Sequence, residues 1–373
     1  MTRSMPSVVG VTGYTGLLGW HLRCALKAYG VEQVRTADRD TFDHLENLSR
    51  FVNGCDTIVH LAGLNRGKPD DVEQTNVMLA ERLVNALRIQ RSTAHVIFSN
   101  STQCDIDTPY GRSKRVASDT LRKWSLECEA SFTDLILPNV FGEGGRPFWN
   151  SAISTFCHQL ANGQEPRIIE DQEIELLHAQ DVSAVIRRCM GDGHNGELRL
   201  PGRRISVSNV LQRLRNLSQE YVHGVIPELP SEFDRQLLNT FRSYYFTVQP
   251  RFNLALHGDE RGVFAEIAKS KGEGQTSYSS THPGITRGDH FHFRKLERFV
   301  VLSGKATIRL RRLFSNEIIA LDVDGEQPVA VDMPTLFAHN ITNSGPDELL
   351  TMFWADEIFD PSTADTFPEA VVL

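Results

Sequence analysis

The sequence predicts an α/β chain in two parts, a Rossmann-type doubly wound parallel sheet over residues 1–245 and an all-β barrel over residues 246–373. In the first part, short β-branched runs alternate with longer helical patterns, which is typical of βαβ units on a parallel sheet. In the second part, short segments alternate with glycine and proline turn signals, which is typical of a sandwich or small barrel. We therefore expect two domains, each with its own core.

Each element follows from a local pattern. Apolar β-branched runs bounded by turn residues predict buried strands, and amphipathic spacing predicts the helices between them. The strands predicted in the first part span residues 8–11, 34–37, 57–61, 95–99 and 134–137, and two of the helices span 17–29 and 76–91. In the second part, strands are predicted at 296–302 and 306–313 around a turn at 303–305. The boundary is expected within 240–258, where aromatic residues and Pro250 interrupt the helical pattern.

The composition excludes several classes of protein. Apolar residues make up 40% of the 373 residues, which is enough for real cores, and the net charge of −8 argues against a general nucleic-acid or anionic-membrane binder. No apolar run approaches the roughly 18 residues of a membrane span, and the N-terminus lacks a secretory signal pattern. The six cysteines are scattered singly and are expected to be reduced thiols. We therefore expect a cytoplasmic protein with neither a nucleic-acid nor a membrane partner.

A glycine-rich segment follows the first predicted strand and opens the first predicted helix. Its three glycines fit the pattern GxxGxxG, a loop in which the backbone approaches a pyrophosphate at a helix N-terminus. The residues expected to hold the dinucleotide are Gly13, Tyr14, Thr15, Gly16, Leu17, Leu18 and Gly19. After the second strand, Asp38 favours NAD through a ribose hydroxyl, and Arg39 favours NADP through a 2′-phosphate. We carry NADP(H) forward because Arg39 adds a phosphate partner, with NAD as the alternative.

A second group of polar residues follows the fourth predicted strand. Tyr110 and Lys114 are four positions apart, so they share one face of a helix. The Lys114 ammonium is expected to favour the phenolate and so to lower the pKa of Tyr110. Ser101, at the strand end, adds a hydroxyl for the same substrate oxygen. Beside a nicotinamide, these three residues predict catalysis of hydride transfer between a carbonyl and an alcohol.

The densest cluster of metal-ligating residue types lies in the second part. His290 and His292 are two positions apart and face one side of a strand, with Glu297 expected on the neighbouring strand and His339 on a later one. Three imidazoles and one carboxylate suit Zn²⁺, Fe²⁺, Ni²⁺ or Mn²⁺, and zinc is our first choice. The alternative is a metal-free site whose histidines act as acid or base.

The glycine-rich loop together with Ser101, Tyr110 and Lys114 resembles the extended short-chain dehydrogenase/reductase family, whose members mostly act on nucleotide-sugars. The resemblance implies that Tyr110 and Lys114 also contact the cofactor, as do Leu61, Ala62, Gly63 and Asn76. It further implies that Asn139 faces the sugar nucleotide and that Arg146 binds the diphosphate. The loop between Ser101 and Tyr110 is shorter than in most extended members, so Thr102 is an alternative helper to Ser101.

The histidine cluster resembles the two signatures of the cupin family. The first signature matches in full, whereas Pro328 and Leu336 stand where the second usually has glycines. Residues 286–290 are similar to the segment that carries the base histidine of metal-free cupin sugar epimerases, which keeps the metal-free alternative open. Nearby candidates for proton transfer are Lys295, Asp332 and His282.

The order of the two sites resembles a family of bifunctional capsular polysaccharide enzymes, in which an extended short-chain dehydrogenase/reductase is fused to a C-terminal cupin. The resemblance covers residues 1–373 and implies a UDP-linked deoxy amino-sugar substrate, in UDP-N-acetyl-L-fucosamine synthesis. The cupin would invert C3 of a UDP-2-acetamido-2,6-dideoxy-4-keto-hexose, whose ketone acidifies the C3 hydrogen. The reductase would then reduce C4 to give UDP-2-acetamido-2,6-dideoxy-β-L-talose. Both families imply a homodimer.

Two alternatives remain open at this point. In one, the cupin is a binding or dimerisation module, and the chain is only a nucleotide-sugar 4-reductase or epimerase. In the other, the cupin is a metal dioxygenase fused to a reductase. The first predicts no proton exchange at C3 by the C-terminal half, and the second predicts oxygen uptake.

Overall fold

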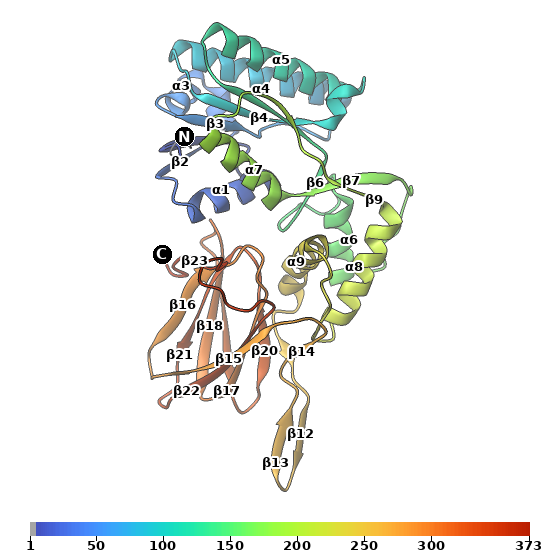
Figure 1. Cartoon of the computed structure of the whole chain (residues 1–373), viewed down its shortest axis with the longest axis vertical. Helices are drawn as coiled ribbons and strands as arrows, with labels where there is room; N and C mark the ends of the chain where they lie inside the picture. Colours follow the sequence, from blue (N-terminus) through green and yellow to red (C-terminus); the bar gives the residue numbers. More distant parts are fainter. Residues whose placement is uncertain (1–4) are drawn as a thin grey trace. The chain divides into compact units, whose positions relative to one another are not determined.

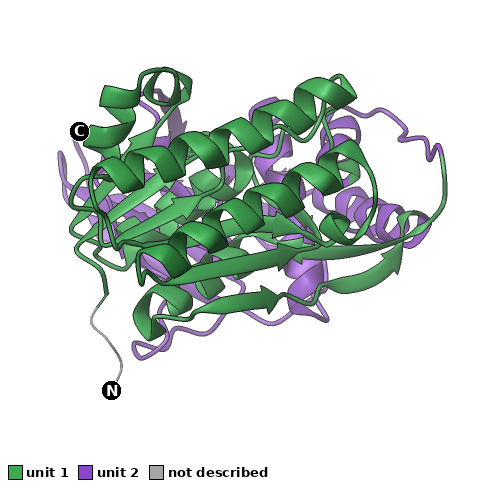
Figure 2. Cartoon of the chain, turned by 90° about the horizontal axis from the view of Figure 1, so that it is seen from above, with its two compact units in different colours: residues 1–152, 170–207 green, residues 153–169, 208–373 purple. Residues whose placement is uncertain are grey.

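The computed structural model describes residues 5–373 and divides into two compact units. Unit 1 comprises residues up to 152 together with 170–207, and unit 2 comprises residues 153–169 together with 208–373 (Figure 2). Within residues 5–373, no helix has both the length and the apolar character needed to cross a membrane.

Unit 1 is built on a six-stranded parallel sheet (Figure 1). Its strand order is β2-β1-β3-β4-β5-β8, and every neighbouring pair is parallel. The strands are β1 (Val8–Thr12), β2 (Gln33–Ala37), β3 (Thr57–His60), β4 (His95–Ser101), β5 (Phe132–Leu137) and β8 (Gly196–Arg199). The Rossmann-type fold and the five strands predicted from the sequence are thereby confirmed. Because the chain order reverses at β1, the carboxyl ends of β1 and β3 form the edge at which such sheets bind ligands.

Helices cover both faces of this sheet. Leu22 of α1 (Leu17–Ala28) and Ile186 of α7 (Ala179–Asp192) pack on one face with Ile97 of β4. Leu83 and Trp124 pack on the other face with Phe98 of β4. The helices of that second face are α3 (Leu45–Val52), α4 (Pro69–Ile89) and α5 (Pro109–Glu127). The remaining elements of unit 1 are α2 (Arg39–Asp43), the 3₁₀ turn η1 (Thr102–Asp105) and a small sheet of β6 (Asn139–Phe141), β7 (Glu173–His178) and β9 (Arg203–Ser206).

Unit 2 contains two five-stranded sheets that enclose one core, so the all-β C-terminal part expected from the sequence is confirmed. One sheet has the order β11-β20-β17-β22-β15 and the other β19-β18-β21-β16-β23. The first sheet comprises β11 (Phe252–Asn253), β15 (Gln275–Thr281), β17 (Glu297–Ser303), β20 (Val329–Met333) and β22 (Leu349–Ala355). The second comprises β16 (Thr286–Phe291), β18 (Lys305–Arg312), β19 (Ile318–Asp324), β21 (Phe337–Asn343) and β23 (Phe367–Pro368). Val301 and Met333 from one sheet and Ile308 and Ile341 from the other pack in a single barrel-like core.

The strands predicted on either side of the turn at 303–305 are β17 and β18. They do not pair as a hairpin, because β17 lies between β20 and β22 while β18 lies between β19 and β21. The turn therefore carries the chain from one sheet to the other. Gly304, with φ of +88°, supplies the left-handed backbone conformation that this change of direction needs.

Unit 2 also includes helices and short strands outside the two sheets. The helices are α6 (Ala152–Ala161), α8 (Val207–Tyr221) and α9 (Glu232–Val248). β10 (Val225–Ile226) pairs with β14 (Lys269–Ser270), and β12 (Leu256–Asp259) with β13 (Gly262–Ala265) forms a hairpin. Phe246 of α9 packs in the core of the two sheets. The boundary expected at 245/246 lies within α9 and stays a prediction. In the structure, unit 1 ends at residue 207 and unit 2 continues from residue 208.

Candidate functional site

The glycine-rich loop after β1 packs tightly enough to require two of its glycines. A Cβ on Gly13, whose φ is +65°, would lie 2.7 Å from the backbone nitrogen of Ala62. A Cβ on Gly19 would lie 2.3 Å from the carbonyl oxygen of Gly13. Gly16 precedes α1, which has neither a side-chain cap nor an acidic residue in its first turn. The loop therefore presents backbone N–H groups at a helix N-terminus, as a phosphate site requires.

The loop after β3 is held against β1 and α4 by hydrogen bonds. The Thr12 hydroxyl accepts from the backbone N–H groups of Leu61 and Ala62, each at 3.1 Å. Asn76 Oδ1 accepts from Leu64 N at 2.6 Å, and its Nδ2 donates to Leu64 O at 2.9 Å. Asn76 is buried, so its observed role is to fix the loop that contains Gly63. Its contact with a cofactor stays a prediction, as do those of Leu61, Ala62 and Gly63.

Asp38 and Arg39 lie where β2 ends and α2 begins. Asp38 Oδ1 accepts from Thr41 N at 2.9 Å and from Thr41 Oγ1 at 2.7 Å, which makes Asp38 the N-cap of α2. These hydrogen bonds lower the pKa of Asp38. Both side chains are exposed at the end of a strand adjacent to β1. A ribose contact from Asp38 and a phosphate contact from Arg39 stay predictions.

The structure brings Ser101, Tyr110 and Lys114 together at the end of β4. Tyr110 and Lys114 lie one turn apart on α5, and a hydrogen bond links the hydroxyl groups of Tyr110 and Ser101. Lys114 is buried, and its Nζ donates to Ser99 O at 2.6 Å and lies 5.9 Å from the centre of the Tyr110 ring. Ser101 is thus the hydroxyl seen beside Tyr110, and the choice between Ser101 and Thr102 as helper at the substrate oxygen stays a prediction.

The electrostatics of this group differ from the sequence expectation in one respect. Burial lowers the pKa of Lys114 to about 8, opposed by the negative charges of Asp134 and Cys104. Burial raises the pKa of Tyr110, opposed by its hydrogen bond with Ser101. The expected lowering of the Tyr110 pKa is wrong for this arrangement, because burial outweighs the hydrogen bond with Ser101 and raises the pKa. A tyrosine with a raised pKa stays protonated at neutral pH and is equipped to donate a proton.

The two predicted substrate residues lie on the segment that follows β5. Asn139 begins β6, is exposed and donates to Glu175 O at 3.3 Å. The Arg146 guanidinium lies 4.5 Å from the centre of the Trp149 ring. The guanidinium of Arg66, which the sequence analysis missed, lies 5.5 Å from the same ring and donates to Phe148 O at 2.8 Å. Substrate contacts by Asn139 and Arg146 stay predictions.

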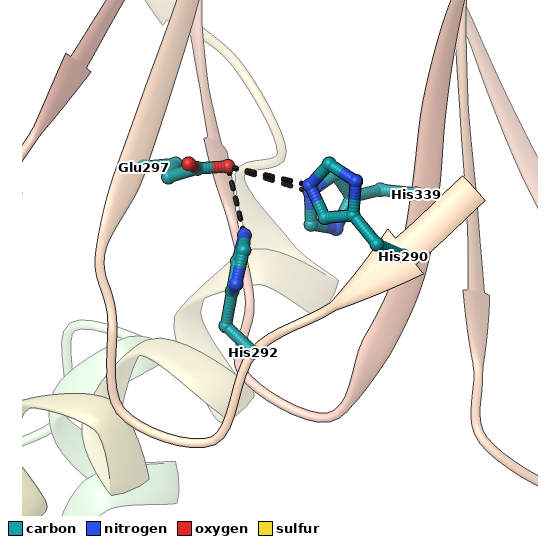
Figure 3. Close-up of side chains that lie close together, drawn as sticks. All are labelled: His290, His292, Glu297 and His339. Carbon is teal, nitrogen blue, oxygen red and sulfur yellow. Dashed lines mark hydrogen bonds and ion pairs between the residues drawn. The ribbon is translucent and has the colours of Figure 1, made fainter. Parts of the chain in front are cut away.

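In unit 2, His290, His292, Glu297 and His339 converge as the sequence predicted (Figure 3). One candidate ligand atom from each residue lies within 4.8 Å of all the others. Glu297 Oε2 lies 2.9 Å from His292 Nε2, 3.5 Å from His339 Nε2 and 3.9 Å from His290 Nε2. Glu297 begins β17 in one sheet, whereas His290 and His339 come from β16 and β21 in the other. The cluster therefore joins the two sheets.

The outer nitrogens of two imidazoles fix the orientation of the rings. His339 Nδ1 donates to Phe337 O at 3.0 Å, and His292 Nδ1 donates to the backbone oxygen of Asp365. When neutral, His339 held in this way turns an unprotonated Nε2 toward the centre of the cluster. Burial lowers the pKa of His339 to about 4, so this ring is neutral at pH 7.

The centre of the cluster has the properties of a cation site. His339 Nε2 is buried and has no hydrogen-bond partner among residues 5–373. Burial opposes ionisation of Glu297, but the three surrounding histidines together outweigh it and lower the pKa of this carboxyl. Lone pairs on the imidazoles and an ionised carboxylate thus face one point, which fits a divalent metal held with ordered outer-shell hydrogen bonds.

A cavity of about 300 Å³ adjoins this cluster. Its lining includes Glu297 and Lys295, the aromatic rings of Phe353 and Phe359, and much of the segment 357–366. Lys295 Nζ lies 2.6 Å from Glu297 Oε1. Of the three proton-transfer candidates, only Lys295 lies at the cavity: His282 is exposed near Glu348, and Asp332 is buried in an ion pair with Arg298.

The comparisons with known proteins match both parts of the chain. The model of the NAD dependent epimerase/dehydratase family matches residues 9–199. The chain belongs to this family. Its C-terminal part, residues 257–367, matches the polysaccharide biosynthesis C-terminal domain. Membership of the family supports a nicotinamide cofactor for unit 1.

Two relatives resemble this chain along its whole length. It is 31% identical to the UDP-2-acetamido-2,6-beta-L-arabino-hexul-4-ose reductase of Pseudomonas aeruginosa, over 96% of this chain and 97% of the relative. The crystal structure of the capsular polysaccharide assembling protein CapF from Staphylococcus aureus is 30% identical, covers 98% of this chain and 100% of that chain, and superposes with a TM-score of 0.62. A UDP-N-acetylglucosamine 4-epimerase from Methanobrevibacter ruminantium shares the fold over 67% of this chain, with a TM-score of 0.54 at 17% identity. The two-part architecture expected from the sequence is thereby confirmed.

Proposed function

We propose that the chain is a bifunctional nucleotide-sugar enzyme. The all-β domain inverts C3 of a UDP-2-acetamido-2,6-dideoxy-4-keto-hexose, and unit 1 reduces C4 to give UDP-2-acetamido-2,6-dideoxy-β-L-talose, in UDP-N-acetyl-L-fucosamine synthesis. The observation that carries the proposal is the end-to-end similarity to a nucleotide-linked 4-ketose reductase, joined to the Ser101, Tyr110 and Lys114 arrangement.

The reduction uses the group at the end of β4. When bound, NADPH would supply a hydride for C4 of the sugar. Tyr110, protonated because burial raises its pKa, donates a proton to the ketone oxygen, while Ser101 hydrogen-bonds that oxygen and orients it. The buried ammonium of Lys114 favours the phenolate that Tyr110 becomes. Hydride plus proton convert the C4 carbonyl into an alcohol.

The cofactor and the substrate would be held by the loops around the sheet edge. The glycine-rich loop, residues 13–19, would hold the pyrophosphate, and Asp38 and Arg39 the adenosine ribose with its 2′-phosphate. Asn139 would contact the sugar nucleotide, and Arg146 its diphosphate. The exposed guanidinium of Arg39 favours NADPH over NADH.

The epimerisation is assigned to the cavity beside the histidine cluster. The C4 ketone acidifies the C3 hydrogen, so a base in the cavity removes that proton, and its return from the opposite face inverts C3. His290, His292, Glu297 and His339 would hold a divalent metal, zinc as first choice, which as a Lewis acid would stabilise an enolate. Lys295, beside Glu297, offers an ammonium to the same developing charge.

The proposal is tested by mass spectrometry of the 4-keto substrate incubated with the full chain in D₂O. Deuterium at C3 without NADPH, and a C4 alcohol only when NADPH is present, are the expected results. Tyr110→Phe should reduce C4 reduction by roughly 10²–10⁴-fold while C3 exchange continues. Tyr278→Phe, on an exposed tyrosine of β15, is the matched control and should behave as the wild type.

Each failure has a distinct meaning. Reduction without C3 exchange would leave a 4-reductase with a non-catalytic C-terminal domain. Exchange by a protein shown to contain no metal would favour the metal-free alternative. Light scattering tests the proposed homodimer.

A further inference from the structure

The loop between β16 and β17 connects two of the four clustered residues, and its backbone is fixed by a residue far along the chain. His292 opens this loop and Glu297 follows it. The carboxylate of Asp365 accepts hydrogen bonds from three successive backbone N–H groups of the loop. These donors are Phe293 N at 3.1 Å, Arg294 N at 2.7 Å and Lys295 N at 2.8 Å. Asp365 is only 3% exposed, so its charge is compensated by these N–H groups rather than by water.

Asp365 also contacts the cluster itself. Its backbone oxygen accepts from His292 Nδ1, so one residue sets both the loop that bears His292 and the orientation of the His292 ring. Hydrogen bonds to the outer nitrogen of a ligating histidine fix its tautomer and its aim at the metal. The next N–H of the loop, Leu296 N, donates at 2.8 Å to Asp356, another buried carboxylate.

The segment held by Asp365 forms a wall of the adjoining cavity. Residues 357–360 and 363–366 line it, together with Lys295 and Glu297 from the loop. Arg294 adds two further contacts with this segment, to Glu357 Oε2 at 3.3 Å and to Thr363 O at 3.2 Å. Metal ligands, loop and cavity wall therefore share one set of hydrogen bonds.

We propose that Asp365 is a positioning residue of the metal centre, and that it couples metal binding to the order of the cavity wall formed by residues 357–366. The inference rests on the metal site of the proposed function. With Asp365 in place, His292 aims its Nε2 at the site before the metal arrives. Because the coupling is reciprocal, bound metal stabilises the wall, and an ordered wall strengthens metal binding. The wall is the surface against which the keto-sugar would be held, so loss of the metal would also weaken substrate binding.

The first test uses the unaltered full chain. It is stripped with a chelator, reloaded with Zn²⁺ alone, and followed by hydrogen exchange of peptides that cover 293–296 and 357–366. We expect exchange in both peptides to be faster without metal and to slow when Zn²⁺ returns. Equal exchange in the two forms would overturn the coupling.

The second test compares two matched substitutions for Zn²⁺ affinity, measured by competition with a chromophoric chelator. Asp365→Asn keeps the size of the side chain but faces N–H donors with a weaker acceptor, and it should weaken Zn²⁺ binding by roughly 10–100-fold. Asp324→Asn is the control, because Asp324 likewise accepts from two backbone N–H groups, those of Glu326 and Gln327, in the turn after β19. It should bind Zn²⁺ as the wild type does.

The outcomes separate this inference from the proposed function. Wild-type affinity in Asp365→Asn would overturn the positioning role even if C3 exchange is present. Weaker affinity in a chain that shows no C3 exchange would uphold the positioning role and reject the epimerase. A wild-type chain that binds no Zn²⁺ would overturn the inference and leave the reductase proposal intact. If Asp365→Asn does not fold, the exchange test on the unaltered chain decides.

Discussion

At the residue scale, Ser101, Tyr110 and Lys114 depend on a buried carboxylate that the sequence analysis did not single out. Asp134 lies in β5, is 2% exposed, and accepts from Ser118 Oγ at 2.5 Å and from Asn100 Nδ2 at 3.2 Å. Asn100 Oδ1 in turn accepts from the backbone N–H of Ser101 at 2.8 Å. Asp134 therefore supports the strand end that carries Ser101, and its charge raises the pKa of Lys114. A carboxylate inside an apolar strand run is the signal by which it could have been found.

This arrangement makes a prediction for Asp134→Asn. Lys114 loses a neighbouring negative charge, so its pKa falls below about 8 and the alkaline limb of the kcat/KM profile for C4 reduction moves to lower pH. On that limb, a shift of one pH unit lowers kcat/KM at a given pH by about tenfold. The measurement is the pH profile of NADPH oxidation with the keto-sugar.

Ser118→Ala is the control for this prediction, since it removes a hydrogen bond to Asp134 without removing charge. An alkaline limb that stays in place in Asp134→Asn would contradict the argument. The charged or titratable groups that act on Lys114 or Asp134 are Cys104, Arg122, Glu197 and His60, and all remain in both variants.

At the scale of elements, the sequence indicated those strands whose two faces are both buried. β1, β3, β4 and β5 are continuous apolar runs between helical layers, so composition alone marks them. β12, β13 and much of β15 are exposed, and their sequences carry no such signal. The four clustered residues were predictable because three of them lie close together in residues 290–297 and His339 lies in a second recognisable segment. Asp365 was not, because its partners lie about seventy residues away in sequence.

The helices α8 and α9 are tied to one of the two sheets, at β17 and β20, by a buried polar network. Arg298 of β17 donates to both oxygens of Asp332 of β20, at 2.7 and 3.0 Å. Tyr221, at the end of α8, donates to Asp332 at 2.8 Å, and Arg242 of α9 donates to Met333 O at 2.7 Å. Burial opposes ionisation of Asp332, but Arg298, Arg242 and Tyr221 together outweigh it and lower the pKa of this carboxyl. Asp332 is thus a structural residue rather than the proton-transfer group considered from the sequence.

The network predicts unequal costs for two substitutions. Asp332→Ala leaves the buried guanidinium of Arg298 without its partner and should destabilise unit 2 by about 3–5 kcal/mol. Tyr221→Phe removes one hydrogen bond while the ion pair remains, and should cost about 1 kcal/mol. Hydrogen exchange of the amides of β17 and β20 measures both. Asp322→Ala is the control, because Asp322 is exposed on β19 and bonds only Thr307 among the contacts described for it. Equal costs for Asp332→Ala and Asp322→Ala would contradict the prediction.

At the scale of the whole molecule, the all-β domain makes buried contacts with helical residues that precede the boundary expected from the sequence. Besides Arg242, α9 supplies Asn239, which donates to Arg294 O at 2.9 Å, and Arg235, which pairs with Asp356. The first contact reaches the loop between β16 and β17, and the second reaches Asp356, which accepts from Leu296 N of that loop. The helix α9, most of which the sequence analysis assigned to the reductase domain, therefore packs against the loop that precedes Glu297. Local periodicity identifies such helices but does not tell which core they join, because packing partners are set by tertiary contacts.

This packing predicts how fragments of the chain behave. A fragment of residues 208–373 retains Tyr221, Asn239 and Arg242, so it should fold and bind Zn²⁺. A fragment of residues 246–373 retains the four clustered residues but loses those three side chains. Arg298 and Asp332 then lose the helices that bury them, and the loop between β16 and β17 loses its hydrogen bond from Asn239. It should aggregate, or bind Zn²⁺ at least roughly tenfold more weakly. Circular dichroism and Zn²⁺ titration of the two fragments make the comparison, and α6 is absent from both.

If the shorter fragment folds and binds Zn²⁺ as well as the longer one, α8 and α9 belong functionally to the reductase. If only the longer fragment exchanges deuterium at C3 of the 4-keto-sugar, the epimerase domain begins at α8 rather than at the first strand of the two sheets.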